Sequence, residues 1–244
     1  MSARSLLVRG MLVGVVAGLL ANAFGTLFGE SQINQAIAFE YAHTPPGMDD
    51  AEPVSRTIQS TLGLTVAVLV YGAALGGVFA LAFAFVHGRL GQFRARVTAL
   101  LVAGIGLVAM FLVPFLKYPA SPPGIGHHDT IGRRTALYFL MVLISVAAAT
   151  GAALLGRSLT QRLGGWNATL VAVAAFLAVA AVAAAILPGV NEIPDDFPAV
   201  VVWRFRVASV GTQLVLWTTL GLLFGALTER AARRQAEALT SVPA

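Results

Sequence analysis

The chain has 244 residues, of which 57% are hydrophobic and only 11% are charged. A soluble domain has about 45 to 50% apolar and about 25% charged residues, so this composition excludes a water-soluble globule. The chain contains no cysteine, which excludes disulfides and thiolate metal sites. Its net charge of +5 does not indicate a nucleic-acid partner, because the basic residues lie in short segments beside apolar runs.

Six unbroken apolar runs follow one another along the chain. Each is about as long as a helix that crosses roughly 30 Å of hydrocarbon, whereas a β-barrel would show alternating segments of about ten residues. We therefore predict an all-α, polytopic membrane bundle of about six transmembrane helices, or five, in a single membrane domain over residues 1–244. The predicted spans are 6–28, 58–86, 97–116, 136–156, 168–187 and 207–227.

The first run has a second interpretation as a signal peptide. Arg4 and Arg9 precede it, and Ala21, Asn22 and Ala23 resemble a small-residue cleavage site. The run is nevertheless long enough to span, so we expect it to be retained as a helix. Cleavage would leave five helices without inverting the others.

Charge sorts the connecting segments into two sets. One set carries ten of the 16 basic residues and two of the 11 acids; it comprises the N-terminus, residues 88–96, residues 157–166 and the tail from residue 228. The other set carries the remaining nine acids; it comprises the loops 29–57, 117–135 and 188–206. The positive-inside rule places the first set, and with it both termini, in the cytoplasm. The acidic loops are then expected to face outward.

Glycines recur at four-residue spacing in three of the runs. They are Gly10, Gly14 and Gly18 in the first, Gly72 and Gly76 in the second, and Gly221 and Gly225 in the sixth. Helices in lipid associate through close contact of small residues. We expect these glycines to form packing faces within the chain, with a homodimer face as the alternative.

Asn22 and Gln213 are the amide side chains that lie well inside a predicted span. Each is about six residues, or roughly 9 Å, from the outer end of its helix. An interhelical hydrogen bond and a polar step on a solute path both fit this position. We favour the hydrogen bond, because neither an acid nor a histidine accompanies these residues in the hydrocarbon.

The centres of the spans carry no Asp, Glu or Lys, so chemistry is expected at the outer rim. Imidazole and carboxylate together suit borderline divalent ions such as cobalt, nickel and zinc. The candidate metal ligands are His127, His128, Asp129, His43, Glu30 and Glu40. They follow no local ligand motif such as HExxH, so plain polar surface is the alternative.

Several cations lie on the outer side, which the positive-inside rule disfavours, and this indicates ion pairing with nearby acids. The predicted ion-pair residues are Glu52, Arg56, Arg133, Arg134, Glu192, Asp195, Asp196, Arg204 and Arg206. Such a network would shape a vestibule or only fold the rim. The chain has no phosphate-binding loop, nucleophile elbow or dinucleotide fingerprint, so we do not expect an enzyme.

Polar-rich segments along nearly the whole chain carry a family resemblance. They read GESQI at 29–33, AIAFE at 36–40, EPVSR at 52–56, VPFLKYPA at 113–120, TIGRRTALY at 130–138, NEIPDDFP at 191–198, WRFR at 203–206 and SVGTQLVLW at 209–217. In this order they resemble the CbtA family of bacterial cobalt transporter subunits.

The resemblance implies uptake of cobalt(II) across the bacterial cytoplasmic membrane, linked to cobalamin synthesis. It also implies about five spans for this chain, and a small, single-span, histidine-bearing partner of the CbtB type. Besides that partner we expect the lipid bilayer, no nucleic acid, no cofactor required for folding, and homo-oligomers as a further form of assembly. The alternative function is a non-transporting scaffold that holds a metal-capturing partner. The family supplies no ligand motif, so the histidines are candidates from their chemistry alone.

Overall fold

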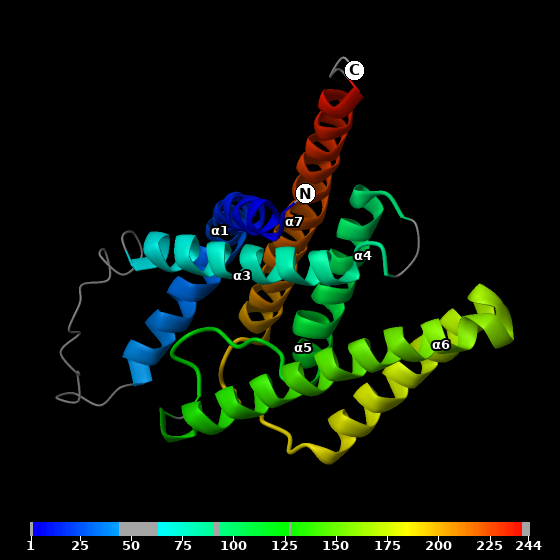
Figure 1. The fold of residues 1–244 in the computed structure, drawn as a ribbon. Coiled ribbons are helices and arrows are strands. Elements are labelled where there is room, and N and C mark those ends of the chain that lie inside the picture. The colour runs from blue at the N-terminus through cyan, green and yellow to red at the C-terminus, as the bar shows by residue number, and fades with distance from the viewer. Residues whose placement is uncertain (1, 44–62, 90–92, 127, 241–244) are drawn as a thin grey trace. The chain divides into compact units, whose positions relative to one another are not determined.

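The computed structural model describes residues 2–43, 63–89, 93–126 and 128–240, and these form helices joined by loops (Figure 1). The elements are α1 (Ala3–His43), α3 (Leu64–Val86), α4 (Ala95–Leu107), the π-helical turn η2 (Val108–Leu112), α5 (Val113–Lys117), the 3-10 turn η3 (His128–Thr130), α6 (Ile131–Ile186) and α7 (Ala199–Thr240). Five helices in this described part are long and apolar enough to cross a membrane, with α4, η2 and α5 counted as one. The all-helical membrane fold is thus confirmed, and the chain is a multi-pass membrane protein.

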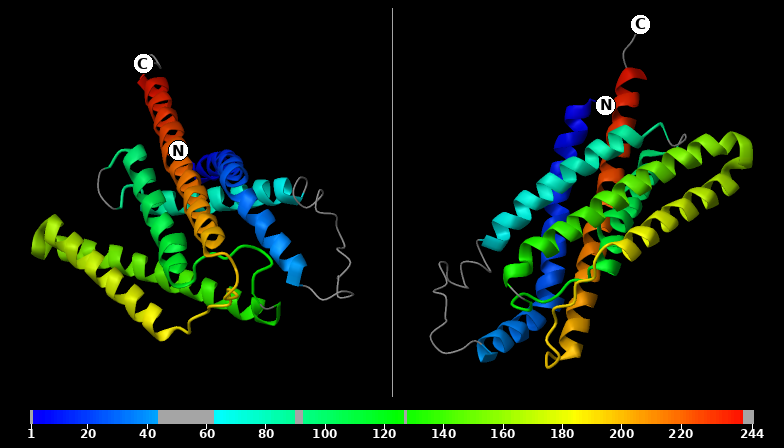
Figure 2. Two further views of the ribbon diagram at one scale, coloured as in Figure 1. Left: turned by 180° about the vertical axis from the view of Figure 1, so that it is seen from behind. Right: turned by 90° about the horizontal axis from the view of Figure 1, so that it is seen from below.

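α6 contains two of the predicted spans. It is 56 residues long, more than twice the roughly twenty residues that cross a bilayer. Gly164 interrupts it with φ 74° and ψ 162°, a conformation open to glycine. Figure 2 shows the two limbs of α6 doubling back as a hairpin, and a Cβ on Gly156 of one limb would lie 3.1 Å from the Cβ of Ala172 of the other. The count of five spanning helices and the predicted count of six spans therefore differ in whether this hairpin is counted once or twice.

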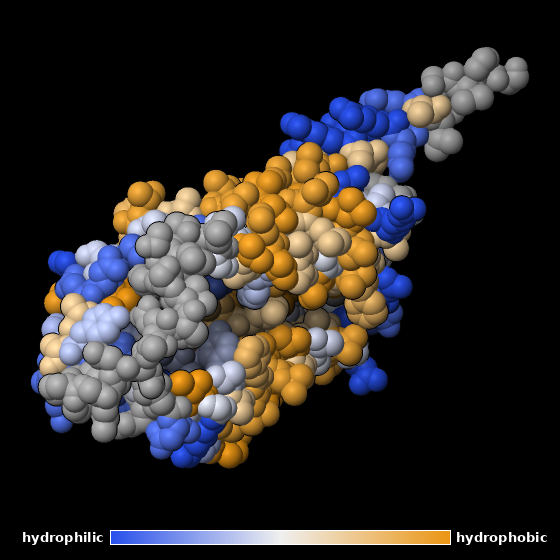
Figure 3. All heavy atoms as spheres, turned by 90° about the vertical axis from the view of Figure 1, so that its left-hand side faces the viewer, coloured by the Kyte–Doolittle hydropathy of each residue, from blue (hydrophilic) through white to orange (hydrophobic). Residues whose placement is uncertain are grey.

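Large apolar side chains lie exposed along the spanning helices. Leu12 of α1, Val70 of α3, Leu101 of α4, Leu143 of α6 and Leu222 of α7 are examples. Figure 3 shows such hydrophobic surface on one face, with hydrophilic side chains on the C-terminal part of α7. Exposed apolar surface of this extent is typical of helices that contact lipid rather than water.

The chain divides into two compact units. The first unit comprises Met1–Glu30, His43–Gly104 and Ala208–Ala244, and the second comprises Ser31–Ala42 and Ile105–Val207. The first unit therefore holds most of α1, all of α3, most of α4 and most of α7. The second unit holds the C-terminal end of α1, η2, α5, η3, the α6 hairpin and the first residues of α7. The single membrane domain stays a prediction.

In the first unit, α1 and α3 cross at their glycines. A Cβ on Gly72 would lie 2.6 Å from the carbonyl oxygen of Gly14. A Cβ on Gly14 would lie 2.8 Å from the Cα of Gly76 and would also meet the carbonyl oxygen of Gly72. The neighbouring atoms are backbone, so only glycine permits this approach. The spacing predicted from the sequence therefore marks an interhelical contact within the chain.

α7 packs into the same unit through glycine and phenylalanine. A Cβ on Gly225 would lie 2.9 Å from the Cα of Arg96 in α4. Next to Gly225, the ring of Phe224 meets those of Phe79 and Phe83 of α3 edge-on, at 5.3 and 5.1 Å between centroids. Edge-to-face rings at this distance add to the packing energy. α7 is thus held against both α3 and α4.

In the second unit, the π-helical turn η2 lies directly before α5 and interrupts the α-helical hydrogen bonding there. The N–H of Val113 bonds to the carbonyl of Val108, five residues back. Pro114, the next residue, has no N–H to offer the preceding turn. Single π-helical turns inside α-helices recur at functional sites. Phe111 of this turn lines a cavity described below.

The glycine crossing predicts the effect of a single methyl group. Replacing Gly14 by alanine would force α1 and α3 apart, and overpacking of this kind costs about 1 to 3 kcal/mol of unfolding free energy. Replacing Gly104 of α4 by alanine is the matched control, because no atom of the described residues lies within 4 Å of its Cβ position. We expect Gly104→Ala to leave stability unchanged or raise it by at most about 1 kcal/mol. Unfolding by SDS in mixed micelles measures both, and equal stability of the two variants would contradict the crossing.

Candidate functional site

Loops that the charge analysis assigned to one side of the membrane meet in the second unit. The hydroxyl of Tyr118, directly after α5, donates a hydrogen bond to the carbonyl of Pro188, 2.9 Å away. The hydroxyl of Thr130 in η3 donates to Oε2 of Glu192, 2.8 Å away. Each bond joins the 117–135 loop to the 188–206 loop. The two acidic loops therefore share one rim.

A small hydrophobic core supports this rim. Its buried residues are Ala36, Ile125, Phe197, Val201 and Val202, and Phe39 and Ile193 pack against it. The rings of Phe39 and Phe197 meet edge-on at 5.0 Å between centroids. This core attaches the 117–126 segment and the start of α7 to the C-terminal end of α1. The end of α1 thereby joins the other two loops.

Two carboxylates converge on the short stretch 124–126 of this rim. Gly124 and Gly126 both have positive φ, 77° and 112°, which glycine adopts readily. The carboxylate of Glu40 occupies the place that a Cβ on Gly124 would need. Oε2 of Glu192 would lie 2.9 Å from a Cβ on Gly126. Acids from α1 and from the 188–206 loop therefore lie at the residues that immediately precede His127.

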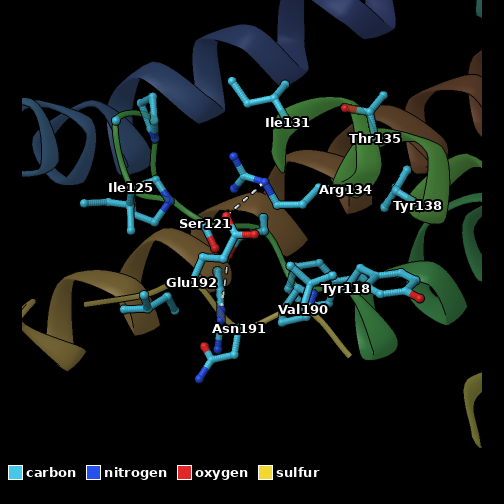
Figure 4. A pocket seen from close by; sticks show the side chains of 18 of the residues that line it. Tyr118, Ser121, Ile125, Ile131, Arg134, Thr135, Tyr138, Val190, Asn191 and Glu192 are labelled. Carbon is cyan, nitrogen blue, oxygen red and sulfur yellow. Dashed lines mark hydrogen bonds and ion pairs between the residues drawn. The ribbon is translucent and has the colours of Figure 1, made fainter. Parts of the chain in front are cut away.

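Glu192 also forms an ion pair with Arg134, shown in Figure 4. Nε of Arg134 and Oε2 of Glu192 are 3.3 Å apart, and the two side chains are 28% and 16% exposed. The same carboxylate oxygen accepts the hydrogen bond from Thr130. Both charged residues belong to the set predicted for outer-rim pairing. Their partial burial makes the loss of one partner more costly than at an exposed pair, because the remaining charge has little water around it.

A cavity of about 650 Å³ lies beside the ion pair (Figure 4). Its aromatic lining residues are Phe111, Phe115, Tyr118, Tyr138 and Phe139, its charged ones are Arg134, Glu192 and Arg206, and Ser121, Thr135 and Asn191 add uncharged polar groups. Desolvation raises the pKa of Tyr118, against a smaller lowering by the charge of Arg133. This shift favours the protonated hydroxyl, the form that donates to Pro188. Aromatic walls with a few polar groups are typical of small-molecule sites.

The other predicted rim residues have varied positions. Asp129 and His43 are exposed, and Glu30 is partly buried on α1 in the first unit. Exposed members of the predicted ion-pair set are Arg133, Asp195, Asp196 and Arg204. Glu52, Arg56 and His127 lie outside the described residues, and of His128 only the backbone, in η3, is described.

The described residues contain no group of three His, Asp or Glu side chains that could hold a metal ion. His127 lies outside these residues. The ligand roles of the six candidates, and the wider ion-pair network, stay predictions.

Asn22 and Gln213 lie on neighbouring helices of the first unit. Thr212 contacts the Cβ position of Gly25 at 3.4 Å, which sets this part of α7 beside α1. Both amides are partly buried. Gln213 accepts a hydrogen bond from the indole Nε1 of Trp217 in its own helix, at 3.2 Å. The interhelical bond to Asn22 and the polar path both stay predictions.

The first unit holds an ion cluster that the sequence analysis did not single out. Glu229, 9% exposed, accepts a hydrogen bond from Nη2 of Arg233 at 2.8 Å and lies 3.5 Å from Nε of Arg96. Arg9 donates to the hydroxyl of the adjacent Thr228, at 3.2 Å. The Glu-Arg spacing of four residues was a visible signal for part of this cluster. Its contacts join the N-terminal, 88–96 and tail segments, which the charge analysis placed on one side.

The Arg134–Glu192 pair predicts a stability difference between two acids of one loop. Glu192→Gln leaves the partly buried guanidinium of Arg134 without its carboxylate, so we expect a loss of about 1 to 3 kcal/mol in unfolding free energy. Asp195→Asn is the control, because Asp195 is exposed in the same loop and should change stability by less than about 0.5 kcal/mol. Thermal unfolding in detergent measures both. Equal midpoints for Glu192→Gln and the parent protein would rule out a stabilising pair.

Comparison with known proteins adds one finding. A family model described as "Probable cobalt transporter subunit (CbtA)" matches residues 3–229. No curated protein and no solved structure matches the chain. The matched region begins at the first residue of α1 and ends at Glu229 of the ion cluster in α7. The resemblance carried by the polar segments is confirmed, and the chain belongs to the CbtA family of probable cobalt transporter subunits.

Proposed function

We propose that the chain is a permease subunit that takes divalent cobalt across the bacterial cytoplasmic membrane for cobalamin synthesis. Family membership supports cobalt as the ion, and the multi-pass fold supports a role within the bilayer. The observation that carries the proposal is the convergence of Glu40 and Glu192 on residues 124–126. This convergence brings carboxylates to the stretch just before His127, His128 and Asp129.

In this proposal the outer rim captures the ion. Clustered acids raise the local concentration of a cation before it binds. Imidazole nitrogen and carboxylate oxygen then suit cobalt, with geometry and ligand set deciding its selection over nickel and zinc. We assign Glu40, His127, His128 and Asp129 to the ion. Glu192 pairs with Arg134 and holds the rim that presents these ligands.

A partner completes the transporter in this proposal. The family description names a subunit, which implies another protein. We infer a small, single-span partner of the CbtB type that brings further histidines. A non-transporting scaffold is the alternative, and it is favoured by helix centres without Asp, Glu or Lys. The two functions differ in whether this chain conducts the ion.

Cobalt entry into liposomes tests the proposal. The purified chain alone, the small partner alone and both together are reconstituted, and entry of radioactive cobalt chloride is followed. We expect entry well above that of empty liposomes when both chains are present, and none with the partner alone. Entry with the partner alone would leave this chain as a scaffold. The absence of entry in every preparation would contradict transport.

Substitution of the assigned ligands tests the capture site. We expect Glu40→Gln, and separately the double change His127→Ala with His128→Ala, to weaken cobalt binding by at least about tenfold, because each removes a group that holds the ion. The control is Asp195→Asn, which removes an exposed outer acid of the neighbouring loop. Calorimetry with cobalt chloride in detergent gives the affinities, and membrane fractionation checks insertion. Unchanged affinity in the Glu40 and histidine variants would remove the rim from the mechanism.

A further inference from the structure

The cavity beside the Arg134–Glu192 pair has the dimensions of a small-molecule site rather than of an ion site. Its volume of about 650 Å³ falls within the roughly 300 to 1,000 Å³ of ligand pockets. Five aromatic side chains line it, and aromatic carbon does not coordinate a divalent metal. A bare cobalt ion would leave most of this space and wall unused. The cavity therefore fits an organic body with a polar group.

The charges that line the cavity favour an anion. Among the described lining residues are two guanidinium groups and one carboxylate, a net charge of +1. The carboxylate of Glu192 is neutralised by Arg134, from which its oxygen is 3.3 Å away. Arg206 is then the cation that has no counter-charge among these described residues. A ligand with one negative charge would balance the site.

Arg206 is held in place by one hydrogen bond, and this bond leaves its terminal nitrogens available to a ligand. Its Nε donates a hydrogen bond to the carbonyl of Ala120, 3.2 Å away, which fixes the side chain against the 117–126 segment. This is the interaction that Arg206 makes within the described part of the chain, so both terminal nitrogens keep their donor capacity there. A guanidinium fork of this kind matches a carboxylate or phosphate in two parallel hydrogen bonds. Preorganisation by the Ala120 bond reduces the entropy lost on binding.

We propose that this cavity binds an oxyanion, a carboxylate or phosphate group carried by a small organic molecule, with Arg206 as its direct partner. Ser121, Thr135 and Asn191 offer neutral donors around the ligand, and the aromatic rings contact its body. Two sources carry this chemistry: a soluble organic anion and the headgroup of an anionic membrane lipid. Glu40 and Asp129, the described side chains assigned to the metal, do not line the cavity, so they are separate from this site.

Binding of benzoate, a carboxylate with one negative charge and an aromatic body, tests the soluble source. The full chain is placed in nanodiscs of neutral phosphatidylcholine and titrated with benzoate by calorimetry. We expect Arg206→Gln to weaken binding by about tenfold or more, since a charge-assisted pair is lost. Arg204→Gln is the matched control: it removes the same charge two residues away, from an exposed residue that does not line the cavity. Arg206→Lys keeps the charge without the fork, and it replaces Arg206→Gln if loss of the Ala120 bond prevents folding.

Lipid retention tests the other source. Nanodiscs containing phosphatidylglycerol are dissociated, and native mass spectrometry counts the lipid kept by the protein. Retention by the parent protein and by Arg204→Gln, with loss in Arg206→Gln or Arg206→Lys, would assign the site to a lipid headgroup. Failure of the parent protein to bind either probe would overturn the proposal. So would equal weakening by the Arg204 and Arg206 variants, because a general loss of positive charge would then explain the binding.

Discussion

Close approach of helix backbones is the constraint on which the first unit depends. Lipid tails are as apolar as leucine, so burial of apolar side chains gives little drive for helices to associate in a bilayer. Dispersion contacts at short range must supply the driving force for association, and a side chain at the helix crossing would remove these contacts. Gly14 and Gly72 bring α1 and α3 together in this way, and Gly225 brings α7 against α4. Phe224 then fills the space beside α3 that small residues leave.

The second unit is organised at its rim by different forces. A small core of buried apolar side chains around Phe197 and Ile125 attaches three chain segments to one another. Glu192 fixes how these segments are oriented, because its carboxylate accepts a hydrogen bond from the Thr130 hydroxyl and pairs with the Arg134 guanidinium. Capture of cobalt and binding of an organic anion would therefore use opposite charges on adjoining parts of one rim.

Much of this arrangement could be predicted from the sequence. Apolar runs of membrane-crossing length predicted the helices, and four-residue glycine spacing predicted a packing face. Charge counts predicted which loops share a side, and the structure joins two of them through Tyr118 and Thr130. The helical structure of most of residues 157–166 within α6, the π-helical turn and the cavity were not predicted. Each depends on local backbone geometry or on residues far apart in the chain, for which a linear pattern carries no signal.

The sequence by itself determined a multi-pass helical protein, because lipid allows few ways to satisfy backbone hydrogen bonds and helix length must match the bilayer. Family membership also followed from it, through ordered polar segments. Only the tertiary structure decided which charges meet. The sequence offered Glu192 several arginines of the predicted ion-pair set as partners, and the folding of loops 117–135 and 188–206 selected Arg134 and left Arg206 lining the cavity. Charge pairing depends on distances of a few ångströms, which the order of residues does not specify.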